Sequence, residues 1–167
     1  MTTSVQWEFI AACLREELAE YGSLLGLFER QQRFLFERDA NAVLRLANEI
    51  EAQARALGVT RDRRERAVAS FAEAIALPRS SSLRSLLPHI EADARPLLEA
   101  LIAEVNTLLH RVRRTSRHNH SLLSRAVEVH QETLQLLRPN SFTRTYTPAG
   151  RLSVAATQPA STLRAAG

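Results

Sequence analysis

Apolar residues recur along the first forty positions at the spacing of a helix that packs along one side. Five of them follow one another at intervals of seven: Trp7, Leu14, Tyr21, Phe28 and Leu35. Others stand beside this line and widen it: Ile10, Leu18, Leu24 and Leu25. A heptad pattern sustained over about four and a half repeats predicts one long helix over residues 5–38.

A second helix is predicted over residues 41–77. Asp39 or Asn41 is expected to cap it, because these side chains accept hydrogen bonds from the free amides of a first helical turn. Its predicted apolar seam is Val43, Ala47, Ile50, Ala54 and Leu57. Gly58 and the run TRDRRER interrupt this pattern, and Val68, Phe71 and Ile75 then resume it. A polar or kinked middle is expected, with a break near residues 58–61 as the alternative.

A short helix over residues 82–89 follows a linker of Pro78, Arg79 and three serines. Ser82 is its expected cap. The last helix is predicted over residues 92–138, with Pro96 tolerable only in its first turn. No helix breaker stands before Pro139, so this helix spans about 45 residues.

The last helix has a heptad register of its own. Position a holds Leu98, Val105, Val112, Asn119, Ala126 and Thr133. Position d holds Leu101, Leu108, Thr115, Leu122, Val129 and Leu136. A buried asparagine at position a commonly fixes helix register at some cost in stability, and this role is expected of Asn119.

These elements predict an all-α fold, an elongated antiparallel bundle of three long helices plus one short helix. The helical domain covers residues 1–138. Residues 139–167 contain no acidic side chain and little periodicity, which predicts a flexible basic tail. Only 5% of the residues are aromatic and 45% are hydrophobic, a composition that suits helices better than sheets.

Charge is divided unevenly along the chain. All 22 basic residues are arginine; residues 1–57 hold 6 of them against 9 acidic residues, and residues 110–167 hold 9 against 2.

The N-terminus lacks a basic segment, and Glu8, Arg15 and Glu16 break up its apolar residues. Signal peptide and membrane span are therefore not expected, and the single Cys13 has no disulfide partner, so the prediction is a cytoplasmic protein.

The basic run HRVRRTSRHNH, residues 110–120, is the most conspicuous candidate for chemistry. Its arginines and histidines fall on flanking and outer helix positions, which favours a solvated surface over a helix that reads nucleic acid. His118 and His120 are two residues apart and point to nearly opposite sides, so they cannot share a metal ion. We predict no metal, no cofactor and no nucleic-acid partner.

Catalysis has no support in the sequence. There is neither a nucleophile motif G-x-S-x-G nor a glycine-rich phosphate loop. Adjacent carboxylates such as Glu16 and Glu17 are interpreted as helix-surface charges. The chain is therefore predicted not to be an enzyme.

Two apolar lines run side by side along the end of the last helix. The first continues its seam: Leu122, Ala126, Val129, Thr133 and Leu136. The second adds Leu123, Val127, His130, Leu134 and Leu137. This end either packs against two neighbours within the bundle or presents a face to a partner, since contiguous exposed apolar area usually marks an interface.

Several segments together resemble the FlgN-like flagellar type III export chaperones over residues 5–151. They are QQRFLFERDANAVLRLANEIEAQARAL, the short LRSLLPHI, RRTSRHNHSLLSRAVEVHQETLQLL and the tail TYTPAGR. The long helix carries Asn119 followed by Leu122 and Leu123, as in the family, and the tail keeps Thr145, Tyr146 and Gly150. Thr147 departs from the family, where an aspartate is common.

The resemblance implies a cytoplasmic helical chaperone that holds hook-associated proteins of the hook–filament junction, prevents their premature assembly and delivers them to the export apparatus. It also implies that the C-terminal part of the chaperone binds a helical segment of its cargo. Combined with the apolar lines, it gives the expected partner-binding residues: Leu122, Leu123, Arg125, Ala126, Val127, Val129, His130, Leu134, Leu136, Leu137, Arg138 and Tyr146.

Two other functions stay open at this point. One is a non-enzymatic helical scaffold or regulatory stalk of a secretion system, and the less favoured one is a basic nucleic-acid-binding helical protein. The sequence does not specify which junction protein is the cargo or the oligomeric state.

Overall fold

A computed structural model describes residues 3–137, 142–146 and 152–156 of the 167-residue chain. It divides into two compact units, Met1–His120 and Ser121–Gly167. The first unit is a helical bundle, and the second begins within the last long helix.

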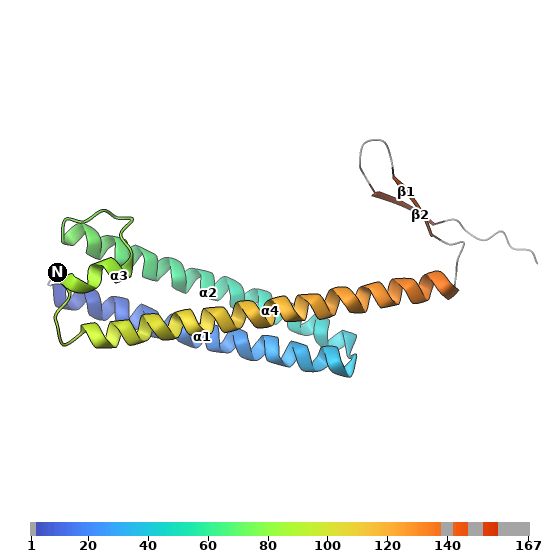
Figure 1. Cartoon of the computed structure of the whole chain (residues 1–167), viewed down its shortest axis with the longest axis horizontal. Helices are drawn as coiled ribbons and strands as arrows, with labels where there is room; N and C mark the ends of the chain where they lie inside the picture. The colour runs from blue at the N-terminus through green and yellow to red at the C-terminus, as the bar shows by residue number, and fades with distance from the viewer. Residues whose placement is uncertain (1–2, 138–141, 147–151, 157–167) are drawn as a thin grey trace, which may run out of the picture. The chain divides into compact units, whose positions relative to one another are not determined.

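The first two helices form an antiparallel hairpin (Figure 1). Helix α1 spans Thr3–Glu37 and α2 spans Ala40–Ala74. The chain reverses through Arg38, which has a φ of 59°, and Asp39 then caps α2 by accepting a hydrogen bond of 2.9 Å from the Ala42 amide. Of the two predicted caps, Asp39 is the one observed, and α2 ends at Ala74, three residues before the predicted end at Leu77.

Helix α2 is continuous through Gly58, so the alternative of a break near residues 58–61 is wrong. The predicted seam of α2 is partly wrong, because Ala47 and Ala54 are exposed. Leu46 is buried instead, and Gln53 faces α1, where its Nε2 donates to Glu20 O at 3.2 Å. A glutamine can occupy a seam position when its amide finds such a partner, and apolar spacing alone does not reveal it.

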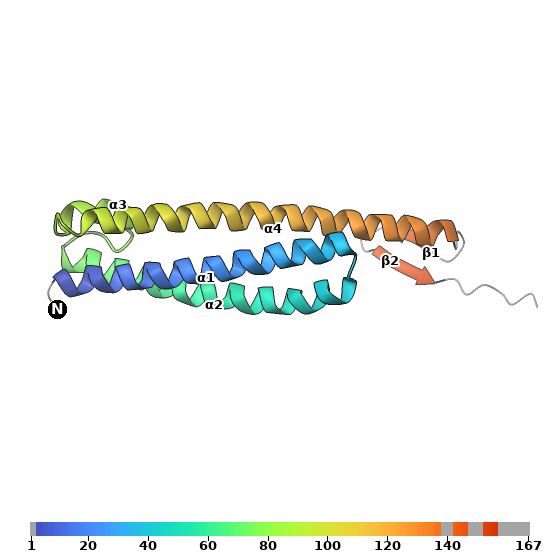
Figure 2. The ribbon, with the colours of Figure 1, turned by 90° about the horizontal axis from the view of Figure 1, so that it is seen from below.

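The chain then crosses to the last helix through α3, Leu83–Leu86, and a 3-10 turn, η1, Leu87–His89. Ser82 caps α3 as predicted, its Oγ accepting from the Ser85 amide at 3.2 Å. Helix α4 spans Arg95–Leu137, so the proline at position 96 lies in its first turn, as predicted. Figure 2 shows α4 alongside α1 within the first unit.

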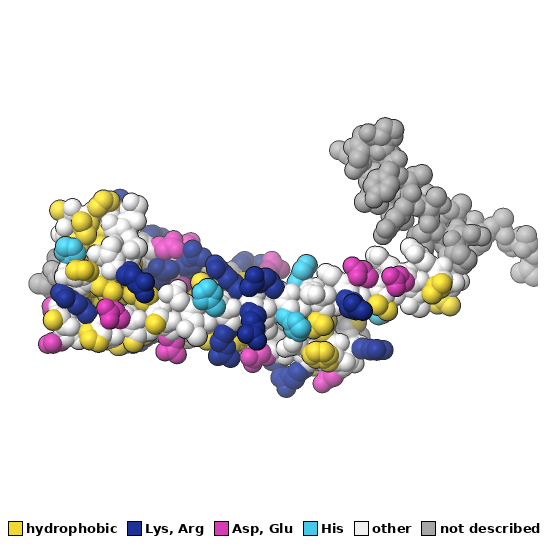
Figure 3. Space-filling view, viewed as in Figure 1, with side chains coloured by type: hydrophobic (Ala, Val, Ile, Leu, Met, Phe, Trp, Pro, Cys, Tyr) yellow, Lys and Arg dark blue, Asp and Glu magenta, His cyan; other side chains and the backbone are white. Residues whose placement is uncertain are grey.

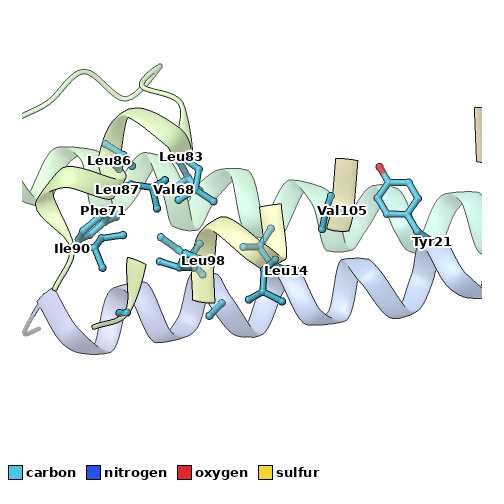
Figure 4. Close-up of a cluster of buried hydrophobic side chains, with 14 of the residues drawn as sticks. Leu14, Tyr21, Val68, Phe71, Leu83, Leu86, Leu87, Ile90, Leu98 and Val105 are labelled. Carbon is cyan, nitrogen blue, oxygen red and sulfur yellow. The ribbon is translucent and has the colours of Figure 1, made fainter. Parts of the chain in front are cut away.

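Where α3 and η1 cover one end of the bundle, the first unit has a cluster of buried apolar side chains (Figure 4). Phe71 of α2, Leu86 of α3 and Leu98 of α4 are each 0% exposed and belong to one apolar cluster. The short α3–η1 segment therefore closes this end, since its own apolar side chains enter the same cluster.

One buried ion pair interrupts this core, and it corrects the interpretation of Glu17 as a surface charge. Glu17 is 1% exposed, and its carboxylate accepts a hydrogen bond of 2.6 Å from Arg64 Nε of α2. The neighbouring pair, Glu16 with Arg63, is exposed at a similar distance of 2.8 Å. Burying a charged carboxylate is costly unless a charged partner or hydrogen-bond donors accompany it, and Arg64 supplies both here. The polar middle of α2 is therefore part of the α1–α2 interface.

The second unit contains residues 121–137 of α4 and two strands, β1 (Phe142–Tyr146) and β2 (Leu152–Ala156). The strands pair antiparallel, with Phe142 opposite Ala156 and Tyr146 opposite Leu152. The apolar periodicity of the sequence does not predict this hairpin. The all-α bundle is confirmed, and the flexibility predicted for the rest of the tail concerns residues outside those described.

Candidate partner-binding surface

The two apolar lines at the end of α4 form the candidate surface. We call one of them the seam line: Leu122, Ala126, Val129, Thr133 and Leu136. We call the other the second line: Leu123, Val127, His130, Leu134 and Leu137. Both lines together are the free face. Leu122 and Leu123 are half-buried, and every residue from Ser124 to Leu137 is exposed. Val127 is 54% exposed and Leu136 84%.

This exposure decides between the two interpretations of the apolar lines. A helix end packed between two neighbours would bury its apolar side chains, as α4 does at Leu98. Within the described parts of the chain, no element covers the free face in that way: Val129 is 51% exposed, Leu134 52% and Leu137 73%. The face is thus an uncovered apolar surface, a feature typical of interfaces.

The polar side chains of the free face are already hydrogen-bonded within α4. Thr133 Oγ1 donates to Val129 O at 2.8 Å. His130 Nδ1 lies 2.8 Å from Ala126 O, and because a carbonyl only accepts, this bond requires the Nδ1–H tautomer. Burying the threonine hydroxyl against an apolar partner therefore leaves no donor without an acceptor.

The free face is also wider than the buried side of the same helix in the first unit. Between residues 98 and 119, position b of the heptad holds polar or charged residues that are all exposed: Glu99, Asn106 and Arg113. After residue 121 the same position holds Val127 and Leu134. Apolar residues at position b extend the face beyond what packing on α1 and α2 uses.

Three predicted site residues lie outside the free face. Arg125 is exposed on α4, at position g of the heptad. Arg138 lies outside the described residues. Tyr146 lies in β1, where its backbone pairs with Leu152.

Asn119 lies just before the free face and joins α4 to α1. It is 1% exposed, as the heptad register predicted. Its Nδ2 donates to Phe28 O at 2.7 Å and to Gln31 Oε1 at 3.0 Å, while its Oδ1 has no hydrogen-bond partner. Gln31 is itself 6% exposed, so two buried amides meet here. The heptad pattern predicts the burial of Asn119 but does not predict Gln31 as its partner.

The basic run preceding the free face is largely solvated, as predicted. Val112 and Asn119 are buried, Thr115 and Ser116 are half-buried, and the arginines and histidines are exposed. Figure 3 shows arginines gathered over the middle of the bundle. Three basic residues of the run share one side of α4: His110, Arg113 and Arg117. Together with Val112 and Ser116 of α4 and Leu24 and Phe28 of α1, they line an open pocket of 510 Å³.

Cys13 and Tyr21 of the first unit lie in surroundings that disfavour their ionised forms. Cys13 is 0% exposed, and burial raises the pKa of its thiol above the ordinary value, although Arg63 opposes this. Burial likewise raises the pKa of Tyr21, with Glu17 as the next cause. Neither group lies beside a general base in an open cleft, the arrangement that nucleophilic catalysis uses.

Within the described ranges 3–137, 142–146 and 152–156, neither a metal-ligating cluster nor a membrane-spanning helix is found. No three His, Cys, Asp or Glu side chains in them are grouped as a metal site. No helix among them has an apolar stretch long enough to span a membrane.

Comparison with known proteins identifies the family. The family described as FlgN protein matches residues 6–153, which is most of the chain. No curated protein and no solved structure matches it. The resemblance carried by the helical segments and by Asn119 with its following leucines is thereby confirmed. The chain belongs to the FlgN family of flagellar export chaperones, a family of chaperones and not of enzymes.

Proposed function

We propose that this chain is a cytoplasmic chaperone that binds hook-associated proteins of the hook–filament junction through the free face of α4. In this function it prevents the premature assembly of its cargo and delivers the cargo to the type III export apparatus. The observation that carries the proposal is the exposure of a two-line apolar face, with Val127 54% and Leu134 52% exposed.

The mechanism follows from the chemistry of the free face. It offers no catalytic group, and what it offers a partner is apolar area at helical spacing. An amphipathic helix recognises another helix through such anchors, three and four residues apart. A cargo helix that packs along part of the free face, including Val127 and Leu134, buries its own apolar side as well, and this side is then unavailable for assembly with other cargo subunits.

Charged replacements on the second line test this surface. The double variant Val127→Glu with Leu134→Glu places two carboxylates where cargo would exclude water, and we expect roughly a hundredfold loss of affinity. The measurement is isothermal titration of the purified full-length chain with each purified junction protein. Helix content by circular dichroism should remain unchanged, because both positions are exposed in the free chain.

Leu44 and Val59 of α2 supply the matched control. They are apolar and 68% and 67% exposed, but they belong to another helix. The variant Leu44→Glu with Val59→Glu should bind cargo like the wild type. If both double variants bind cargo with equal affinity, the binding surface lies elsewhere on the chain. If the chain binds export machinery but no junction protein, the scaffold function is favoured instead.

A further inference from the structure

The free face is too wide for one straight helical partner. The seam line and the second line occupy heptad positions a, d, e and b, which together span about 160° of the helix circumference at 100° per residue. A coiled-coil partner covers mainly positions a and d. Two occupants can therefore share the face, one along the seam line and one along the outer edge of the second line.

We propose that the seam line pairs in an antiparallel orientation with the seam line of a second copy of this chain. The charges that flank the seam line support this occupant. Arg125 and Glu132 both stand at position g, beside Ala126 and Thr133, and both are exposed. Neither has an ion-pair partner within the described part of the chain.

Antiparallel pairing brings position g of one helix opposite position g of the other. When Ala126 packs across from Val129 of the second copy, Arg125 comes opposite Glu132 of that copy. The two-fold symmetry of a homodimer repeats the pair, so each dimer forms two identical ion pairs. The opposite edge brings Leu123 against His130, which involves no like charges.

Other alignments lose this complementarity. Sliding one helix by a heptad in either direction places Glu132 against Glu132 or Arg125 against Arg125, and like charges in contact are destabilising. A parallel pair brings Arg125 near His130 and leaves Glu132 beside Leu137, so no ion pair forms. The charges of this short segment therefore select one orientation and one register.

The pairing is expected to be weak and reversible. In this register the stretch Ser121–Leu134 of one copy overlaps the same stretch of the other, which is roughly 20 Å at 1.5 Å per residue, and two of its core positions are the small residues Ala126 and Thr133. Such an interface belongs with those below about 1,200 Å², which are typical of transient association. Val127 and Leu134, at position b, stay outside the pairing and remain open to another partner.

Sedimentation equilibrium of the full chain tests the pairing without any cargo, so its outcome is independent of the proposed function. The wild type is expected to dimerise reversibly. Arg125→Glu and Glu132→Arg should each raise the dimer Kd roughly tenfold, because each turns both ion pairs into repulsions. The double variant Arg125→Glu with Glu132→Arg should restore the wild-type Kd, since it exchanges the charges and keeps their complementarity.

Two comparisons make the test specific. Glu128→Arg changes the net charge by the same amount as Glu132→Arg, but position c lies on the far side of the helix, so the dimer should persist. Val129→Glu should abolish the dimer, whereas Val127→Glu should leave it intact. A wild type that stays monomeric up to about 1 mM overturns the inference. A dimer that all the single charge reversals leave unchanged overturns it equally.

Discussion

Helix α4 carries one heptad pattern along its whole length, but the two parts of that pattern have different surroundings. At position a, Leu98 and Val105 are 0% and 7% exposed, whereas Ala126 and Thr133 are exposed. In the first part, α1, α2 and the short α3–η1 segment supply the neighbours. The pattern therefore indicates which side chains a helix can bury, and it does not indicate whether the same chain provides the cover.

Truncating one leucine in each part of α4 should give the largest difference in the free energy of unfolding between the two parts. Leu98→Ala removes a side chain that is 0% exposed, and we expect a loss of about 2–5 kcal/mol in the free energy of unfolding. Leu136→Ala removes one that is 84% exposed, and we expect a change within about 0.5 kcal/mol. Urea unfolding followed by circular dichroism measures both, at a protein concentration low enough to keep the chain monomeric. Similar losses in the two variants would mean that the free face is covered in solution.

Asn119 is the last buried residue of α4 before the free face, and its replacement should lower the stability of the bundle. Asn119→Leu removes the donor to Gln31 Oε1 and leaves that buried group without its partner, so we expect a loss of about 1–3 kcal/mol. Adding Gln31→Leu should recover this loss, because two apolar side chains then replace two polar ones. Thermal unfolding of the single and double variants provides the comparison. A single variant as stable as the wild type would show that the amide pair contributes nothing to stability.

A cysteine placed on the free face should react with a thiol reagent much faster than the buried Cys13. The substitution that introduces it should hardly change the stability of the chain. The native Cys13 is buried with a raised thiol pKa, so at neutral pH little of it is thiolate and reagent cannot reach it. Val129→Cys places a second thiol at a position that is 51% exposed. Titration with Ellman's reagent should modify one thiol rapidly in this variant and none rapidly in the wild type. Rapid reaction of Cys13 in the folded wild type would contradict the packing of α1.

Much of the fold follows from the sequence because its signals are local. Asp39 and Ser82 cap helices by hydrogen bonds to residues three positions away, and Pro96 marks a first turn by its own geometry. Burial of Asn119 follows from heptad arithmetic within one helix. These features depend on neighbours along the chain, so a sequence contains what is needed to predict them.

Features that depend on a distant partner were missed. Glu17 is buried because Arg64, 47 residues away, pairs with it, and Gln53 takes a seam position because it reaches Glu20 of α1. Ala54 is apolar but exposed, since the seam of α2 passes through Gln53. Hydropathy therefore predicts the burial of these residues wrongly. It takes no account of a polar partner that only the folded chain brings close.

For the free face, the sequence predicts the residues and leaves the occupant undetermined. The two apolar lines and their spacing can be identified from the chain, and their exposure follows from the absence of a comparable cover among the described elements. The charges of Arg125 and Glu132 become informative only once α4 is known to be a single helix, because their shared position g depends on an unbroken register.

The continuity of α4 has a consequence for the entropy of binding. A peptide of the length of Ser121–Leu137 would be only marginally helical alone, because the first turn of any helix is costly to nucleate. Here the packed turns before Asn119 act as the nucleus, and the later turns only propagate from it. A partner therefore meets a helix that is already ordered, and little of its binding energy is lost in ordering the chaperone.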